Sequence, residues 1–252
     1  MLGFHIMTMS IDDIFSKLLF YVSVPKCVLC AERLDIDDRG LCKSCRRTYE
    51  DHKNMNCSKC KKLIAECSCV NYILRSNKVK RHYKMFKYRS SEESAPGNHL
   101  IYSLKRDNRE DVISFLADEL NELVDRHFSD GERDNMIITN VPRRKKAILS
   151  HGFDHTAQLG KALEKRSGIE FKTILISKGK KAQKQTVGKE RLKNAVFDYK
   201  KGRAEDLGGK TVLILDDIVT TGASVGAAAL LLKELGAKEC VALTVAATYK
   251  DQ

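Results

Sequence analysis

The stretch at residues 211–224 constrains the fold most strongly, because it sets out strand, acidic pair, loop and helix in one short run. Residues 212–215 are an unbroken apolar segment, which is typical of a strand buried on both faces of a parallel sheet. Asp216 and Asp217 follow at the expected end of this strand, and residues 225–235 form an Ala- and Leu-rich helical run. Ligands of open α/β sheets bind at the carboxyl ends of the strands. The pattern therefore predicts an α/β fold with a ligand site after this strand.

The loop between the acidic pair and the helix predicts a phosphate site. A small-residue turn at a helix N-terminus exposes backbone N–H groups and the positive end of the helix dipole, which suits an anion. Carboxylates beside it suit ribose hydroxyl groups, with Mg²⁺ nearby, so a sugar phosphate meets both requirements. The plainer alternative is an ordinary turn with a solvated acidic pair. The predicted phosphate-binding residues are Thr220, Thr221, Gly222, Ala223 and Ser224.

This stretch resembles the phosphoribosyl pyrophosphate (PRPP) loop of type I phosphoribosyltransferases. Further motifs occur in the order expected of the ComF family, whose members join an N-terminal zinc ribbon to a phosphoribosyltransferase-like domain and are associated with DNA uptake in competence. Together they cover most of the chain. The matching motifs are Val141-Pro142-Arg143-Arg144, His151-Gly152-Phe153-Asp154, Gln183-Lys184-Gln185, Glu190-Arg191 with Asn194, and Ala195-Val196-Phe197.

The resemblance implies a type I phosphoribosyltransferase-like parallel sheet flanked by helices, with a small N-terminal zinc-ribbon domain. It implies that Asp216 and Asp217 are the catalytic residues that fix the ribose of PRPP, that residues 220–224 bind its 5-phosphate, and that Mg²⁺ accompanies it. The expected domains are residues 1–74, an amphipathic helix plus a double zinc ribbon, and residues 75–252, the phosphoribosyltransferase-like domain.

Two basic segments also gain roles from the resemblance. Pro142 ends a strand predicted at residues 136–141, and the loop that follows holds pyrophosphate in phosphoribosyltransferases; Arg143 and Arg144 are the expected ligands, with a basic surface turn as the alternative. Residues 177–194 are too long and polar for a tight connection and match the flexible loop that closes over PRPP. A solvated charge run fits each of its lysines almost as well. The expected loop residues are Lys184, Gln185, Arg191 and Asn194.

Eight of the nine cysteines lie between residues 27 and 69, in closely spaced pairs. Such pairs in a chain without an evident secretory signal indicate metal ligands rather than disulfides. Each CxxC turn directs two sulfurs toward one point, and two turns complete the tetrahedral shell of zinc. We predict two structural zinc sites, one formed by Cys27, Cys30, Cys42 and Cys45, the other by Cys57, Cys60, Cys67 and Cys69.

The way these cysteines combine is open at this level. The second set ends in a tighter CxC pair, Cys67 and Cys69, so its metal assignment is less direct than that of the first. Sequential pairing is what the family resemblance implies, whereas a cross-braced arrangement and reduced or disulfide-linked cysteines are the alternatives. Neither set leaves a ligand position free, which indicates structural rather than catalytic zinc.

Charge and hydropathy restrict partners and location. Basic residues exceed acidic ones by 12, and two Cys₄ zinc sites would lower this surplus by about four; acidic partners such as nucleic acid or phosphorylated metabolites are favoured. Residues 11–19 predict a short amphipathic helix that docks the metal domain, with membrane-surface contact as the weaker alternative. No run approaches the roughly 18 apolar residues that span a bilayer. The expected location is cytoplasmic, with peripheral association with a membrane DNA-uptake machinery as an open possibility.

Residues 71–94 interleave basic and aromatic side chains. Basic groups contact phosphates and aromatic rings stack on unpaired bases, so single-stranded DNA is one predicted partner. The favoured interpretation is instead a strand or hairpin whose aromatics face the core, because the alternation suits a half-buried strand. The aromatic residues are Tyr72, Tyr83, Phe86 and Tyr88.

The remaining patterns complete the expected α/β core. Strands at residues 173–176 and 240–245 join those at 136 and 211 in a parallel sheet, and residues 100–128 are helical with a break near 107–109. His151 and His155 are predicted to be hydrogen-bonded structural histidines rather than bases, and Cys240 a small buried hydrophobe. Lys105 and Arg106 resemble the lysine-bearing segment that precedes the family's core.

Two functions of different classes follow. One is a ComF-like protein of natural transformation that handles incoming single-stranded DNA and has a PRPP-binding site, with other DNA-uptake proteins at the inner face of the membrane as further partners. The other is a Mg²⁺-dependent phosphoribosyltransferase that transfers phosphoribosyl from PRPP to a nitrogen nucleophile, which the sequence does not identify. A protein-interaction adaptor is the third account if neither ligand binds. Fold alone does not choose between them.

Overall fold

The computed structural model describes residues 24–88, 95–177, 197–199 and 207–248. The amphipathic helix predicted at residues 11–19 lies outside these ranges. So do the predicted flexible-loop residues Lys184, Gln185, Arg191 and Asn194. Within these ranges, every helix is too short or too polar to cross a membrane.

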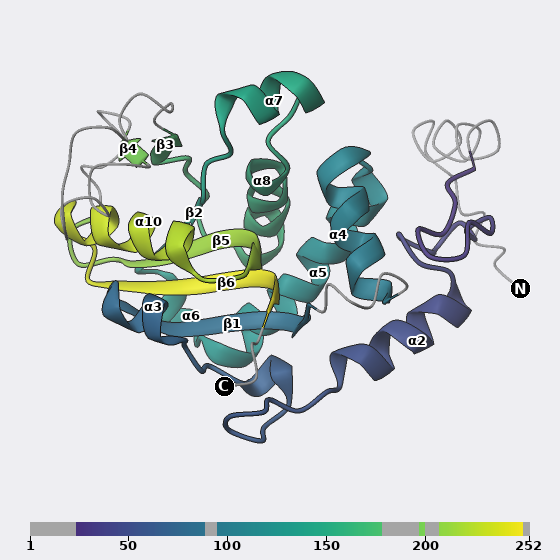
Figure 1. Cartoon of the computed structure of the whole chain (residues 1–252), viewed down its shortest axis with the longest axis horizontal. Helices are drawn as coiled ribbons and strands as arrows, with labels where there is room; N and C mark the ends of the chain where they lie inside the picture. Colours follow the sequence, from purple (N-terminus) through teal and green to yellow (C-terminus); the bar gives the residue numbers. More distant parts are fainter. Residues whose placement is uncertain (1–23, 89–94, 178–196, 200–206, 249–252) are drawn as a thin grey trace, which may run out of the picture.

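A four-stranded parallel sheet forms the centre of the molecule, in the order β1-β6-β5-β2 (Figure 1). Each strand pairs in parallel with its neighbour, so all four carboxyl ends lie at one edge. β2, β5 and β6 are mostly apolar because both faces of the sheet are covered, whereas β1 at the edge has a more polar sequence. They are β1 (Val79–Lys87), β2 (Met136–Asn140), β5 (Thr211–Val219) and β6 (Glu239–Ala247).

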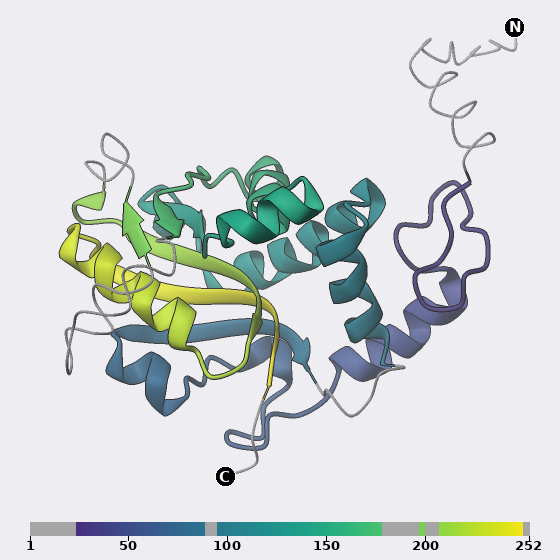
Figure 2. The ribbon, with the colours of Figure 1, turned by 45° about the horizontal axis from the view of Figure 1, so that its top comes forward.

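Alternate residues of the strands serve two separate core layers. Leu213 and Leu215 belong to one layer, whereas Val212 and Ile214 belong to the other. Figure 2 shows helices on both sides of the sheet. The first layer contains side chains of α4 (Pro96–Arg106), α5 (Glu110–His127) and α8 (His155–Ser167), and the second those of α3 (Tyr72–Ser76) and α10 (Ala223–Glu234).

Smaller elements surround this core. The break predicted near residues 107–109 separates α4 from α5, and Asn108 there has a positive φ of 49°. The other elements are α2 (Lys43–Lys53), the 3₁₀ turn η1 (Ile64–Glu66), α6 (Asp130–Arg133), α7 (Lys145–His151), β3 (Leu175–Ser177) and β4 (Phe197–Tyr199).

The strand predicted at residues 173–176 is not part of the main sheet. The chain bridges β2 only at Phe171, opposite Ile138, and then leaves to form β3, which pairs antiparallel with β4. The fourth strand of the main sheet is β1, from the basic and aromatic segment. The favoured interpretation of that segment as a strand whose aromatics face the core is confirmed for Tyr83 and Phe86, which are almost completely buried. The expected half-buried alternation is wrong, because Lys84 between them is buried as well.

The strand that carries the acidic pair is longer than its apolar run suggests. Its pairing with β6 continues past Asp216, through Ile218 opposite Ala246 and Val219 opposite Ala247. Asp216 and Asp217 therefore lie within β5 rather than after it. Consecutive strand residues point to opposite faces, so the two carboxyl groups have different surroundings.

The first cysteine cluster shares the main core. Leu34, Leu41 and Tyr49 are buried in the same layer as α5. The backbone N–H of Gly40 donates to Asp111 Oδ2 at 3.0 Å, and Gly40 itself has a φ of 67°, which favours glycine. The Tyr49 hydroxyl donates to Glu119 Oε2 at 2.8 Å. The domain boundary predicted after residue 74 stays a prediction, and these contacts join residues 34–49 closely to α5.

Candidate functional site

A pocket of about 320 Å³ lies at the carboxyl ends of β2 and β5. Helices α4 and α8 approach it from one side of the sheet and the start of α10 from the other, so distant segments converge there. Its wall combines acidic, basic and hydroxyl groups. The lining residues are Lys105, Val141, Pro142, Arg143, His155, Thr156, Asp216, Asp217 and Ser224.

Two side chains hold the Asp217 carboxyl group: the imidazole of His155 and the ammonium group of Lys105. Its Oδ2 lies 2.6 Å from His155 Nε2 and 3.2 Å from Lys105 Nζ. Burial raises the pKa of Asp217, but the hydrogen bond from His155 and the charge of Lys105 outweigh it, and the net pKa is below the ordinary value. Asp217 is therefore a carboxylate at neutral pH, and Nε2 of His155 is the donor.

Asp216 has the opposite proton affinity. Burial, and then the neighbouring charge of Asp217, raise the pKa of Asp216 well above its ordinary value. Its Oδ1 accepts a hydrogen bond from the backbone N–H of Asp217 at 3.0 Å. Asp217 thus keeps its negative charge, while Asp216 binds a proton more readily. Such a split between adjacent carboxyl groups is typical of functional sites.

The loop at residues 220–224 forms a small hollow next to Asp216, of about 40 Å³. Thr221 Oγ1 accepts from the backbone N–H of Ala223 at 3.3 Å. Within the described part of the chain, the backbone N–H groups of Thr220, Thr221 and Gly222 have no acceptor. Thr221, Ala223 and Ser224 are exposed, so the loop faces solvent rather than packed protein. Its amides and the N-terminus of α10 can receive an anion.

Gly222 is required at the turn into α10. It has a left-handed φ of 84°, and a Cβ at this position would lie 2.8 Å from Leu74 Cγ. Leu74 is completely buried. The close approach of α3 to the loop therefore excludes a side chain at residue 222.

The two arginines predicted to bind pyrophosphate are placed differently. Arg143 lines the pocket, and its Nη1 is shielded from solvent without a hydrogen-bond partner among the described residues. Arg144 is exposed at the start of α7 and does not line the pocket. The structure thus brings Arg143, but not Arg144, to the acidic pair.

Sequence patterns predict only part of the role of Lys105 and His155. Lys105 resembles part of the lysine-bearing segment of the family, but this resemblance assigns it no contact. His155 is hydrogen-bonded, as expected for a structural histidine, but its partner is a predicted catalytic residue. The residue before His155, Asp154, is the sequence signal for this placement because it caps α8. Asp154 Oδ1 accepts from Ala157 N–H at 3.2 Å and from Thr156 Oγ1 at 2.8 Å, which fixes the start of this helix.

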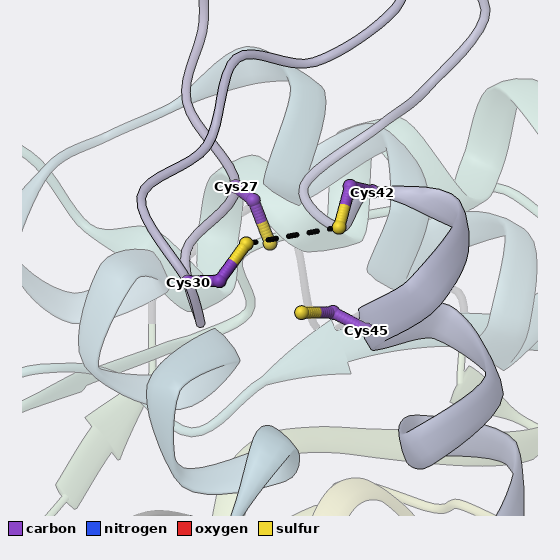
Figure 3. Close-up of side chains that lie close together, drawn as sticks. All are labelled: Cys27, Cys30, Cys42 and Cys45. Carbon is purple, nitrogen blue, oxygen red and sulfur yellow. Dashed lines mark hydrogen bonds between the residues drawn. The ribbon is translucent and has the colours of Figure 1, made fainter.

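The eight N-terminal cysteines form two separate clusters by sequential pairing. In each cluster all four sulfurs lie within 4.8 Å of one another. Figure 3 shows the four side chains of the first cluster pointing to a common centre, with 3.7 Å between Cys30 Sγ and Cys42 Sγ. A tetrahedral zinc with Zn–S bonds of about 2.3 Å separates its sulfurs by nearly this distance. No disulfide joins cysteines of the described chain. Both predicted ligand sets fit zinc, and the cross-braced alternative is wrong.

The second cluster has a charged neighbour that also fits a metal-thiolate centre. Lys84 is completely buried in β1, and its Nζ lies 3.1 Å from Cys67 Sγ and 3.2 Å from the Cys67 carbonyl oxygen. Four thiolates around Zn²⁺ carry a net charge of about −2, which a buried ammonium group partly offsets. Ser68 O also accepts from His82 N–H at 3.3 Å, so this cluster covers the outer edge of β1.

The parallel sheet with helices on both faces is a phosphoribosyltransferase-like fold. The family model "Phosphoribosyl transferase domain" matches residues 147–252. The chain is 26% identical over 235 residues to the competence protein ComFC of Streptococcus pneumoniae (strain ATCC BAA-255 / R6), a match that covers 85% of this chain and 96% of the relative. The two cysteine clusters ahead of this domain, together with this relative, support the predicted resemblance to the ComF family.

Solved structures with lower similarity include the allosteric regulatory enzyme of purine biosynthesis. It has a TM-score of 0.39 and 15% identity, and the match covers 57% of this chain but only 30% of the other. A hypoxanthine phosphoribosyltransferase from Staphylococcus aureus has a TM-score of 0.33 and 13% identity, with coverage of 56% and 74%.

Proposed function

We propose that the pocket binds PRPP, or a closely related phosphorylated ribose, together with Mg²⁺. One observation carries the proposal: a loop with open backbone N–H groups lies directly beside two carboxyl groups of opposite proton affinity. The loop at residues 220–224 would hold the 5-phosphate, while Asp216 and Asp217 accept hydrogen bonds from the ribose hydroxyl groups. Both recognition elements line one continuous region of the wall, because Ser224 and Asp216 belong to both hollows.

The other end of the ligand would lie against Arg143. Its unpartnered Nη1 is a donor without an acceptor, and a pyrophosphate oxygen would satisfy it. Bound Mg²⁺ would supply charge neutralisation to the pyrophosphate. Lys105 would keep Asp217 ionised and in position beneath the ribose, through the contact already described.

We place this site in a protein of natural transformation that handles incoming single-stranded DNA. The relative named as a competence protein supports the role, and so does a basic groove of about 510 Å³ at the amino ends of β1 and β6. Single-stranded nucleic acid binds grooves whose cations follow the phosphate backbone. The groove is lined by Val70, Arg75, Lys78, Val79, Lys80, Lys233, Lys238 and Glu239.

The surface available to DNA differs from the one expected from residues 71–94 as a whole. Tyr83, Phe86 and Lys84 are buried, so they do not present rings or charge to a strand. Among the described residues, exposed cations lie instead in the first part of the segment, at Arg75, Lys78 and Lys80. Tyr72, 83% exposed, is the aromatic ring of this segment that remains open for stacking among the described residues.

A second candidate function is turnover of PRPP by phosphoribosyl transfer. The observation that favours it is the placement of Arg143 on the wall that also holds the acidic pair, where it would stabilise the charge of departing pyrophosphate. A nitrogen nucleophile would form the new bond to C1′ as the bond to pyrophosphate breaks. The acceptor remains to be found by assay.

Calorimetry of the zinc-loaded protein with PRPP and Mg²⁺ tests the main proposal. We expect one site per chain, no binding after Mg²⁺ is removed with a chelator, and competition by ribose 5-phosphate. Incubation of the complex with candidate bases and amines, followed by release of pyrophosphate, then separates turnover from binding alone. An absence of Mg²⁺-dependent PRPP binding would refute the proposal. Separately, single-stranded DNA affinity unaltered by charge reversal in the basic groove would refute the DNA assignment.

A further inference from the structure

The phosphate loop is braced by a segment that emerges from the second cysteine cluster. Asn71, two residues after Cys69, donates from Nδ2 to the carbonyl oxygen of Thr221 at 3.1 Å. The same side chain caps α3, because its Oδ1 accepts from the backbone N–H of Leu74 at 2.8 Å. One amide group thus ties the start of α3 to the loop, across 150 residues of sequence.

This contact determines where a loop donor points. The C=O of Thr221 and the N–H of Gly222 belong to one planar trans peptide unit, so they point in opposite directions. A carbonyl oxygen held toward Asn71 therefore directs the N–H of Gly222 away from α3. That N–H is one of the loop donors without an acceptor in the described chain.

The packing around the brace is tight along its whole length. Leu74 fills the space beside Gly222, and a Cβ built on Gly226, one turn into α10, would lie 3.0 Å from the Asn77 side chain. Val70, between Cys69 and Asn71, is buried in the same core layer as Leu74. The segment from the cluster to the loop therefore has little room to shift independently.

We propose that Asn71 is a positioning residue for the phosphate loop, and that the second cysteine cluster holds it in place. The inference rests on the proposed binding of a phosphorylated ribose. It deepens that proposal by assigning the zinc-ribbon region a direct part in recognition of the 5-phosphate. Arg143, at the pyrophosphate end of the pocket, does not depend on this brace.

The substitution Asn71→Ser separates the two roles of the side chain. Serine is as good a helix cap as asparagine, so the bond to Leu74 N–H is kept. Its short hydroxyl group does not reach Thr221 O, so the brace is lost. We expect the affinity for ribose 5-phosphate to fall about fivefold to tenfold, as for loss of one positioning hydrogen bond. The affinity for inorganic pyrophosphate and the melting temperature should stay unchanged. Ser76→Ala, at an exposed position of the same helix α3, is the matched control.

A second measurement keeps the test independent of the ligand. Amide hydrogen exchange at residues 220–224 should be faster in Asn71→Ser than in the wild type and the Ser76→Ala control. Equal exchange, together with equal affinity for ribose 5-phosphate, would overturn the inference. A parallel loss of affinity for pyrophosphate would also overturn it, because it would indicate a general structural effect. If the wild type binds no phosphorylated ribose, the proposed function fails, and hydrogen exchange alone decides whether Asn71 positions the loop.

Discussion

The two ends of the parallel sheet offer contrasting sites. At the carboxyl end, acidic and basic side chains are paired and largely buried, as in the contacts of Asp217 with His155 and Lys105. At the amino end, the groove is lined by exposed lysines, and its single acid, Glu239, is paired with Arg81 at 3.1 Å. The first arrangement suits a compact ligand with both hydroxyl and phosphate groups, whereas the second suits an extended polyanion.

The difference in burial also predicts a difference in salt dependence. Exposed charges are screened strongly at physiological ionic strength, but buried pairs much less. Binding at the basic groove should therefore weaken steeply as salt increases, while binding in the pocket should change little.

The largest effect is expected from the double variant Asp216→Asn, Asp217→Asn. Loss of the Asp217 carboxylate removes a charged hydrogen bond of about 1.5–3 kcal/mol, and loss of the Asp216 carboxyl group a neutral one of about 0.5–1.5 kcal/mol, so affinity for Mg²⁺-PRPP should fall about 30-fold or more. Affinity for single-stranded DNA should stay within about twofold, because the groove lies at the other end of the sheet. Calorimetry and fluorescence anisotropy measure the two ligands. A variant that still binds PRPP normally would contradict the site assignment.

The next effect concerns the groove. Lys80→Glu with Lys238→Glu should weaken single-stranded DNA binding about tenfold and reduce the slope of log affinity against log salt by about 1 to 2, because about two phosphate contacts are lost. Lys161→Glu with Lys165→Glu, on exposed positions of α8, is the control with the same change in net charge. If both pairs weaken DNA binding equally, the effect comes from net charge and not from the groove.

The third prediction concerns the effect of zinc loss from each cysteine cluster on PRPP binding. Loss of zinc from the second cluster should weaken PRPP binding severalfold through the Asn71 brace, so Cys60→Ser should have a larger effect than Cys30→Ser in the first cluster. Zinc content by mass spectrometry establishes that each variant has lost one equivalent. PRPP affinity is then compared by calorimetry on variants that retain the circular dichroism of the wild type. Equal affinities in the two variants would remove the special role of the second cluster.

The smallest effect is a pH-dependent change of stability. The folded-state pKa of Asp216 is raised, so the native state holds its proton more tightly than the unfolded chain, and stability falls as pH rises above the unfolded value of about 3.9. Asp216→Asn should therefore raise the melting temperature by a few degrees at pH 8 and by little at pH 4. Asp217, with a lowered pKa, contributes stability at neutral pH that is lost as pH falls below 4. Asp217→Asn should lower the melting temperature at pH 8. The same sign for both variants would contradict the assigned pKa directions.

Sequence patterns predicted the helices, strands and cysteine sets that are defined by residues close together in the chain. The run from residue 211 into α10, the split between α4 and α5, and the cysteine sets depend on residues close in sequence, so spacing alone specifies them. The position of β1 in the sheet could not be predicted from local sequence, because its parallel partner β6 lies about 160 residues further along the chain. The hydrogen bond from His82 N–H to Ser68 O, which covers the outer edge of β1, is likewise a tertiary contact. Residues 173–176 failed as a core strand for the same reason: an apolar run shows burial but not the choice of partner.

The site shows the same limit. The loop at residues 220–224 and the acidic pair were predicted from their order in the chain. The contact of His155 with Asp217, and that of Asn71 with Thr221, join segments 62 and 150 residues apart. No periodicity reveals such pairs, because only the packing of α8 and α3 on opposite faces of the sheet brings them together.

The most direct test of the central claim is the ³¹P magnetic resonance spectrum of PRPP with the zinc-loaded protein and Mg²⁺. The 5-phosphate and the pyrophosphate give separate signals, so each end of the ligand reports its own contacts. Binding of the 5-phosphate by residues 220–224 predicts that its signal shifts on addition of protein and returns when ribose 5-phosphate competes. A spectrum in which the 5-phosphate signal stays at its free position, whatever happens to the pyrophosphate signals, would contradict the account.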